Sequence, residues 1–68
     1  MGFHIECELE EDGRWIGEVP ELPGVLVYGA TSDEATLKAQ TLALRVIAER
    51  LEHSEARPQS VHILLNAA

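Results

Sequence analysis

Cysteine, basic residues and long apolar runs are all scarce in this chain of 68 residues. Its single cysteine, Cys7, excludes an internal disulfide and a zinc site built from several cysteines, and it fits a reducing cytoplasm. No apolar run reaches the roughly 18 residues that a membrane span needs. No basic segment leads an apolar stretch at the N-terminus, so we expect neither a membrane anchor nor a signal peptide. The composition predicts a single cytoplasmic domain over residues 1–68.

Basic residues are outnumbered by acidic ones: five Lys and Arg stand against twelve Asp and Glu, a formal net charge of −7. Proteins bind a nucleic-acid backbone largely through Lys and Arg, so we expect no direct binding to nucleic acid. An acidic surface is suited instead to meeting a basic protein by electrostatic steering.

The short length sets a stability problem. Ordering each residue costs roughly 1.5 kcal/mol, and apolar burial in so small a domain barely offsets the total. Small domains are usually stabilised further by disulfides, metals or oligomerisation. Disulfides are excluded, and no motif indicates a metal or other cofactor, so we expect none and predict self-association as a dimer or tetramer.

The first half of the chain predicts three strands. Every second residue from position 3 is apolar: Phe3, Ile5, Cys7 and Leu9. The residues between them are polar and mostly acidic: His4, Glu6, Glu8 and Glu10. This alternation predicts a half-buried strand with an acidic outer face. A turn at residues 11–13 leads to a second strand over 14–19, which the prolines at 20 and 23 end, and residues 25–28 predict a third.

The second half predicts one helix and a last strand. Thr31 followed by Glu34 forms a capping box, so we place the helix from Ser32 to about His53 or Glu55. Arg57-Pro58 marks its exit, because the residue before a proline avoids the helical region. Residues 60–66 then predict a fourth strand, which gives an α+β domain with the order β-β-β-α-β.

The predicted helix carries two apolar stripes. The first is the natural face for packing on the sheet: Ala35, Ala39, Leu42, Ala43 and Val46, with Ile47 at its margin. The second lies opposite, with Thr41 in its middle: Leu37, Leu44, Ala48 and Leu51. Its spacing alternates four and three, as in paired helices, so we predict these residues as an oligomer interface. Edge pairing of the third or fourth strand, or simple exposure of scattered leucines, are the alternatives.

Catalytic interpretations are weaker. His4 and His62 lie on predicted strands and are candidate metal ligands with a Glu if those strands are neighbours, but a solvated polar face is the simpler interpretation. A metal-dependent hydrolase using carboxylates such as Glu6 and Asp12 is a third hypothesis, and an acidic face would repel its nucleic-acid substrate. Trp15 is either a core residue or an interface anchor.

Three motifs in order resemble the HicB antitoxin family. They are Asp12-Gly13, the segment WIGEVPELPG at residues 15–24, and the helix start GATSDEA at residues 29–35. The resemblance covers about residues 3–65, and the Arg57-Pro58 exit is also similar. It implies a partly degraded ribonuclease-H-like β-β-β-α-β fold, with one helix packed on a four-stranded sheet in the order 3-2-1-4.

The resemblance also implies a function. HicB proteins typically neutralise a small basic HicA toxin, which cleaves RNA, by covering its active site. Many carry a C-terminal DNA-binding domain, whereas this sequence stops at Ala68, so we expect no autorepression by this chain alone. We therefore predict a non-enzymatic, homo-oligomeric module that sequesters a HicA-type toxin. The alternative is a stand-alone homo-oligomeric HicB-like protein, of regulatory or unknown role, without a toxin. The predicted partner contacts are Glu6, Glu8, Glu10, Trp15, Glu18, Glu21, Leu22 and Pro23.

Overall fold

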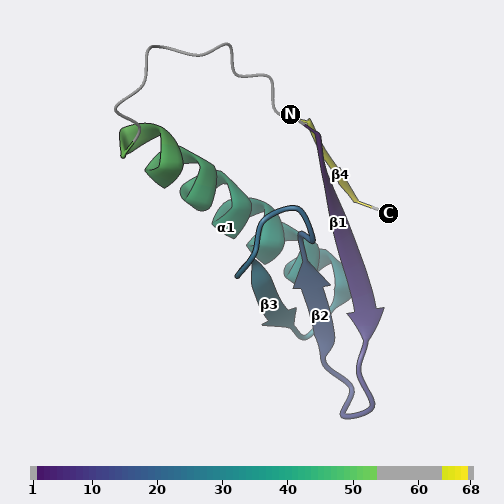
Figure 1. The fold of residues 1–68 in the computed structure, drawn as a ribbon. Helices are drawn as coiled ribbons and strands as arrows, with labels where there is room; N and C mark the ends of the chain where they lie inside the picture. The colour runs from purple at the N-terminus through teal and green to yellow at the C-terminus, as the bar shows by residue number, and fades with distance from the viewer. Residues whose placement is uncertain (1, 54–63, 68) are drawn as a thin grey trace.

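The computed structural model describes residues 2–53 and 64–67. In chain order its elements are β1 (Gly2–Leu9), β2 (Trp15–Glu18), β3 (Leu26–Gly29), α1 (Ser32–Glu52) and β4 (Leu64–Ala67) (Figure 1). The first three strands and the helix lie where the sequence predicts them, within three residues at each end. The predicted helix exit at Arg57-Pro58, and residues 60–63 of the predicted last strand, lie outside the described residues.

The strands form an antiparallel sheet of three, extended at one corner by β4. β1 pairs antiparallel with β2 through Glu6–Leu9, and β2 pairs antiparallel with β3. β4 runs parallel to β1 but pairs only with Gly2–Ile5. The hydrogen-bonded order is therefore β3-β2-β1-β4, but β2 and β4 pair with different halves of the eight-residue β1.

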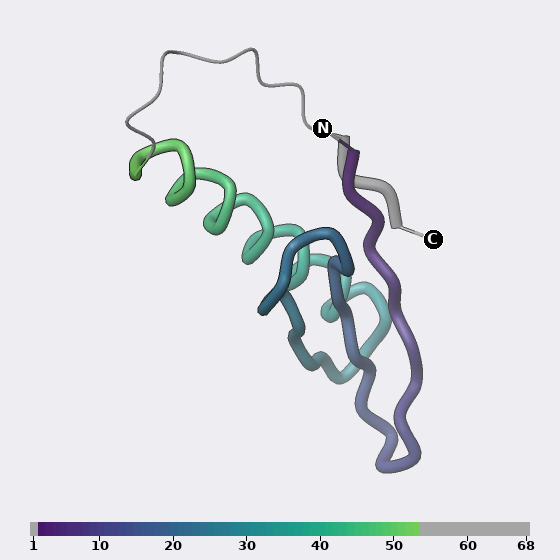
Figure 2. Tube along the Cα trace, viewed as in Figure 1, coloured from purple at the N-terminus to yellow at the C-terminus, as the bar shows by residue number. Residues whose placement is uncertain are grey.

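This division of β1 corrects the predicted fold. Helix α1 packs against β1, β2 and β3 and crosses one face of their sheet diagonally (Figures 1 and 2). The expected ribonuclease-H-like layer, with a helix on four strands side by side, is wrong. The unit that the helix covers is a three-stranded antiparallel sheet, β-β-β-α, because β2 and β3 are only four residues long and end before the half of β1 that pairs with β4.

The core lies between the helix and this sheet. Alternation along β1 buries Phe3 and Ile5, and the helix contributes Ala39, Ala43 and Ile47. These assignments agree with the two periodicities in the sequence. Leu9, which shares their parity, is 56% exposed, because it lies at the end of β1 where the hairpin extends away from the helix (Figure 1).

The helix approaches the sheet unusually closely at its first turn. A Cβ atom added to Gly17 would lie 2.7 Å from the carbonyl oxygen of Ala35, and one added to Gly29 would lie 2.6 Å from the amide nitrogen of Ala35. Ala35, Ala39 and Ala43 are all fully buried. Glycine on the strands and alanine on the helix therefore set the distance between the two layers.

The start of the helix shows the Thr31 half of the predicted capping box. Thr31 Oγ1 accepts a hydrogen bond from the Glu34 amide at 3.1 Å, which confirms the predicted N-cap. The Glu34 carboxylate pairs with Lys38 Nζ at 3.0 Å, and this contact lowers the pKa of Glu34. At the other end the His53 amide donates to the Glu49 carbonyl. No helix in residues 2–53 or 64–67 is long and apolar enough to cross a membrane.

Candidate interaction surfaces

The outer face of the sheet, opposite the helix, carries carboxylates around an apolar patch. The strand register makes Glu8, Ile16 and Tyr28 one cross-strand row, and Glu6, Glu18 and Leu26 the next. Cross-strand partners point to the same face of a sheet. We call the following set the acidic sheet face: Glu6, Glu8, Ile16, Glu18, Leu26 and Tyr28. Leu26 is 46% and Tyr28 is 41% exposed, so this apolar patch faces solvent.

Two carboxylates on the acidic sheet face oppose each other directly. Glu6 and Glu18 are register partners on β1 and β2. Like charges directly across an antiparallel pair destabilise a sheet. A cationic group between them would remove that repulsion.

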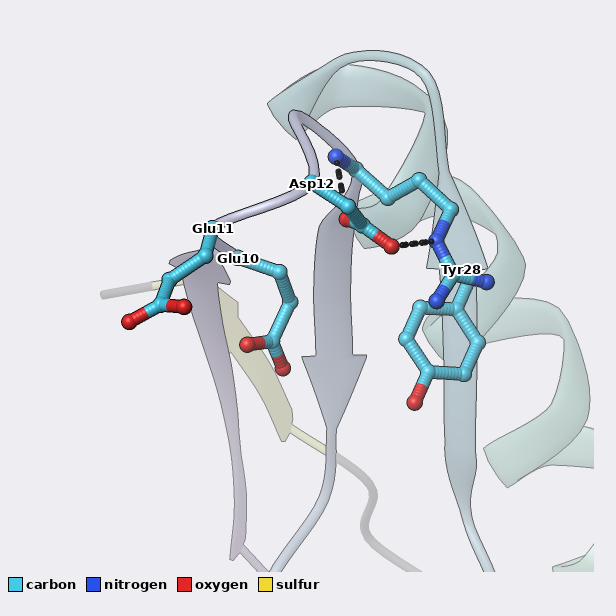
Figure 3. Close-up of a pocket in the computed structure, with 5 residues that line it drawn as sticks. Glu10, Glu11, Asp12 and Tyr28 are labelled. Atoms are coloured by element: carbon cyan, nitrogen blue, oxygen red, sulfur yellow. Dashed lines mark hydrogen bonds and ion pairs between the residues drawn. The ribbon is translucent and has the colours of Figure 1, made fainter.

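A shallow pocket lies where the β1–β2 hairpin meets Tyr28 (Figure 3). It has a volume of about 410 Å³ and is lined by Glu10, Glu11, Asp12, Arg14 and Tyr28. Arg14 lies over the Tyr28 ring, with its Cζ 4.3 Å from the ring centroid. The Asp12 carboxylate accepts hydrogen bonds from the Arg14 amide at 3.0 Å and from its Nε at 2.7 Å, and these bonds lower the pKa of Asp12. The aromatic face thus already holds a guanidinium from the same chain.

The loop after β2 is hydrogen-bonded to the start of β1. Glu21 Oε1 accepts a hydrogen bond from the His4 amide at 3.0 Å and lies 2.7 Å from the His4 ring Nδ1. The bond with the ring lowers the pKa of Glu21. Leu22, in the same loop, is only 2% exposed and belongs to the core. Its prediction as a partner contact is wrong, because the loop folds back through a bond from the Leu22 amide to the Val19 carbonyl.

The other predicted contact residues are dispersed. Trp15 is half-buried and shares the parity of Gly17 on the helix side of β2, so it does not belong to the acidic sheet face. Glu10 lines the hairpin pocket, and Pro23 is exposed in the loop after β2. Only Glu6, Glu8 and Glu18 of the predicted contacts lie together on one surface.

The second apolar stripe of the helix is exposed along its length. Leu37 is 64%, Leu44 is 47% and Leu51 is 42% exposed. Thr41 and Ala48, which lie between them, are also exposed, and Thr41 Oγ1 donates to the Leu37 carbonyl within the helix. We call these five residues the leucine stripe. The stripe lies on the opposite side of α1 from the buried alanines, so it faces away from the sheet.

The free edge of β3 is partly satisfied from within the chain. Lys38 Nζ donates to the Tyr28 carbonyl at 3.1 Å, and the Leu26 amide donates to the Gly24 carbonyl at 3.2 Å. A lysine at a sheet edge discourages strand addition. These bonds make β3 a poor site for the alternative mode of self-association through edge pairing.

The described residues hold no group of three or more His, Cys, Asp or Glu side chains placed to bind a metal ion. His62, one of the two histidines considered as metal ligands, lies outside the residues that the structure describes. Cys7 is half-buried, with its Sγ 3.0 Å from Thr36 Oγ1 on the helix. Its surroundings are those of a packed side chain.

No family model, no curated protein and no solved structure significantly matches this chain. The surfaces themselves therefore carry the functional argument. Sequence reasoning located the carboxylates of the acidic sheet face but missed its apolar members, Ile16, Leu26 and Tyr28. The missing signal was the strand register, which requires the pairing of β2 with β3 as well as the alternation within each strand.

Proposed function

We propose that this protein is a non-enzymatic binding module that sequesters a small basic protein through its acidic sheet face and self-associates through its leucine stripe. The observation that supports it best is the direct opposition of Glu6 and Glu18 beside the exposed Leu26 and Tyr28. A fold optimised only for stability would avoid this like-charge pair. A basic partner with an apolar contact would satisfy both the charges and the patch.

The resemblance to HicB antitoxins supports a HicA-type toxin as the proposed partner. A HicA-type toxin is a small basic protein that binds RNA, so its active surface must attract anions. The acidic sheet face offers that surface carboxylates in place of phosphates, within a cytoplasmic protein of net charge −7. In this proposal the module acts by covering the toxin, and no bond is made or broken.

Neutralising Glu6 and Glu18 tests the binding surface. We expect the double variant Glu6→Gln/Glu18→Gln to be at least as stable as the parent, because it removes a repulsion. The same variant should bind its partner more weakly by about tenfold or more, since charge pairs desolvated in an interface are worth one to several kcal/mol. A small basic protein encoded by an adjacent reading frame would serve as the partner, with affinity measured by isothermal titration calorimetry.

The double variant Asp33→Asn/Glu49→Gln is the matched control, because it also removes two negative charges, at exposed helix positions outside the acidic sheet face. If the control and the Glu6→Gln/Glu18→Gln variant lose affinity equally, the loss comes from net charge alone. That result would contradict a defined binding face. If the protein encoded by the adjacent reading frame does not bind the parent, this result would contradict sequestration of a toxin. The stand-alone homo-oligomer would then be the remaining function.

Leu44→Glu tests the self-association surface. It places a charge in the middle of the leucine stripe, and sedimentation velocity should then show a lighter species than for the parent. Leu9→Glu is the control, since Leu9 is exposed to a similar degree but lies on β1. An unchanged oligomer in the Leu44 variant would show that the stripe is not the interface.

A further inference from the structure

The leucine stripe adjoins a groove between α1 and the edge strand β3. The groove has a volume of about 360 Å³ and is lined by Val27, Leu37, Lys38, Thr41, Leu42 and Arg45. Leu37 and Thr41 belong to both the groove and the stripe. The two features form one continuous surface. The leucine stripe is an apolar ridge on the side of the helix away from the core, and the groove beside it has two cations at its rim and reaches Val27 and Leu42, which pack against the core.

We propose that a second copy of this chain docks antiparallel along this surface, with its Leu51 over Thr41 at the mouth of the groove. The proposal rests on the self-association part of the proposed function and adds the orientation and register of the helices. It also predicts which surfaces remain accessible in the dimer. The occupant is a second copy because the large and small residues of the stripe complement each other, and because Lys38 and Glu52 beside it carry opposite charges.

The side-chain sizes favour an antiparallel pair. Large and small residues alternate along the stripe: Leu37, Thr41, Leu44, Ala48 and Leu51. A parallel pair in register would set each leucine against the same leucine and leave gaps at the small residues. An antiparallel pair that sets Leu44 against Ala48 of the second copy also sets Thr41 against Leu51 of the second copy. Each of these layers then contains one large and one small residue, which is how packed interfaces avoid voids, and Leu37 lies beyond the last of them.

The charges beside the stripe select between two antiparallel registers. Lys38, Arg45 and Glu52 follow the stripe on its groove side, one residue after a leucine in each case. In the proposed register Lys38 lies next to Glu52 of the second copy. A shift of the partner by one heptad keeps the large-to-small packing but brings Lys38 against Arg45 of the second copy. Opposite charges at these flanking positions stabilise a helix pair, and like charges oppose it.

The two layers of the fold keep the acidic sheet faces outside this dimer. The stripe lies on the far side of α1 from the core, whereas Glu6 and Glu18 lie on the far side of the sheet. Each copy can therefore hold a basic partner while its helix is paired. The expected assembly with such a partner has two copies of each protein.

Disulfide trapping in a Cys7→Ser background tests the register. The double variant Thr41→Cys/Leu51→Cys should form a covalent dimer in a glutathione redox buffer, seen on a non-reducing gel. The two cysteines of one chain are about 15 Å apart along the helix, too far to bridge each other. The single variants Thr41→Cys and Leu51→Cys are matched controls. Each should stay monomeric on the gel, since identical positions are also about 15 Å apart in the antiparallel pair.

A covalent dimer from Thr41→Cys alone would show parallel helices and overturn the proposal while leaving self-association intact. The Cys7→Ser parent could also sediment as an oligomer while none of the variants cross-links. That result would place the interface elsewhere and overturn the proposal as well. A monomeric parent would refute both this inference and the self-association part of the proposed function. None of these outcomes depends on binding of the basic partner, which the Glu6 and Glu18 variants test.

A second measurement tests the register without Leu51→Cys, which removes an interface leucine and thereby weakens packing of the dimer. Arg45 lies next to Arg45 of the second copy at the two-fold axis in the proposed register. Arg45→Ala should therefore tighten the dimer several-fold, with the gain shrinking at high salt. A weaker dimer in the Arg45→Ala variant would overturn the register. Circular dichroism of each variant verifies that the helix is retained.

Discussion

Gly29→Ala should destabilise the domain by forcing its two layers apart. The added Cβ would lie 2.6 Å from the amide nitrogen of Ala35 and 3.0 Å from its Cα, whereas ordinary contact begins at 3.4 Å. Both atoms are backbone at the start of α1, so a side-chain rotation cannot relieve the clash. The helix or the strand must move by several tenths of an ångström.

The expected cost combines two opposing effects. Overpacking of this kind costs about 1–3 kcal/mol. Alanine also reduces the entropy of the unfolded chain, which returns about 0.4–1 kcal/mol. We expect a net loss of about 1–2 kcal/mol in the free energy of unfolding. In a domain of this size each kcal/mol lowers the melting temperature by about 4–8 °C.

Urea unfolding followed by circular dichroism measures this cost through the signal of the single helix. Gly2→Ala is the matched control, because a Cβ at Gly2 meets no atom within 4 Å. The two variants share the change in unfolded-state entropy, so their difference isolates the clash. A Gly29 variant as stable as the Gly2 variant would refute the close helix–sheet contact.

Two further predictions concern contacts at the surface of the fold. Thr31→Ala removes the acceptor of the Glu34 amide and should cost about 0.5–2 kcal/mol in urea unfolding. The lowered pKa of Glu21 means that its contact with His4 stabilises the fold above pH 4.5, the ordinary value, and is lost as the pH falls through the folded-state pKa. An NMR titration of Glu21 that shows no downward shift would contradict this contact.

The helix and strands followed from local signals in the sequence. The alternation from Phe3 to Glu8 reports the two faces of β1, and the Thr31 cap fixes the start of α1. Such signals act over a few residues, so a single sequence contains them in full. The width of the sheet depends instead on which half of β1 each neighbour pairs with, and no local pattern records that register.

Residue type misled the interpretation of the loop after β2. The sequence predicts Glu21, Leu22 and Pro23 as partner contacts, but a loop that folds back can bury its apolar residue in the core. Leu22 fills the same cluster as Val19 and Val25, the residues that flank the loop. A leucine between prolines in a small domain is therefore ambiguous until the loop path is known, because so short a chain needs every apolar side chain that it can bury.

The same need to bury apolar side chains bears on the exposed leucines of the leucine stripe. Leu37, Leu44 and Leu51 remain in solvent although the chain is short of buried apolar surface. Isolated exposed leucines are common on soluble proteins and need no explanation. These three instead recur every seven residues on one side of one helix and alternate with small residues. Chance exposure predicts no such period, whereas burial against a second helix requires it, so the missing part of the core is best sought in another copy of the chain.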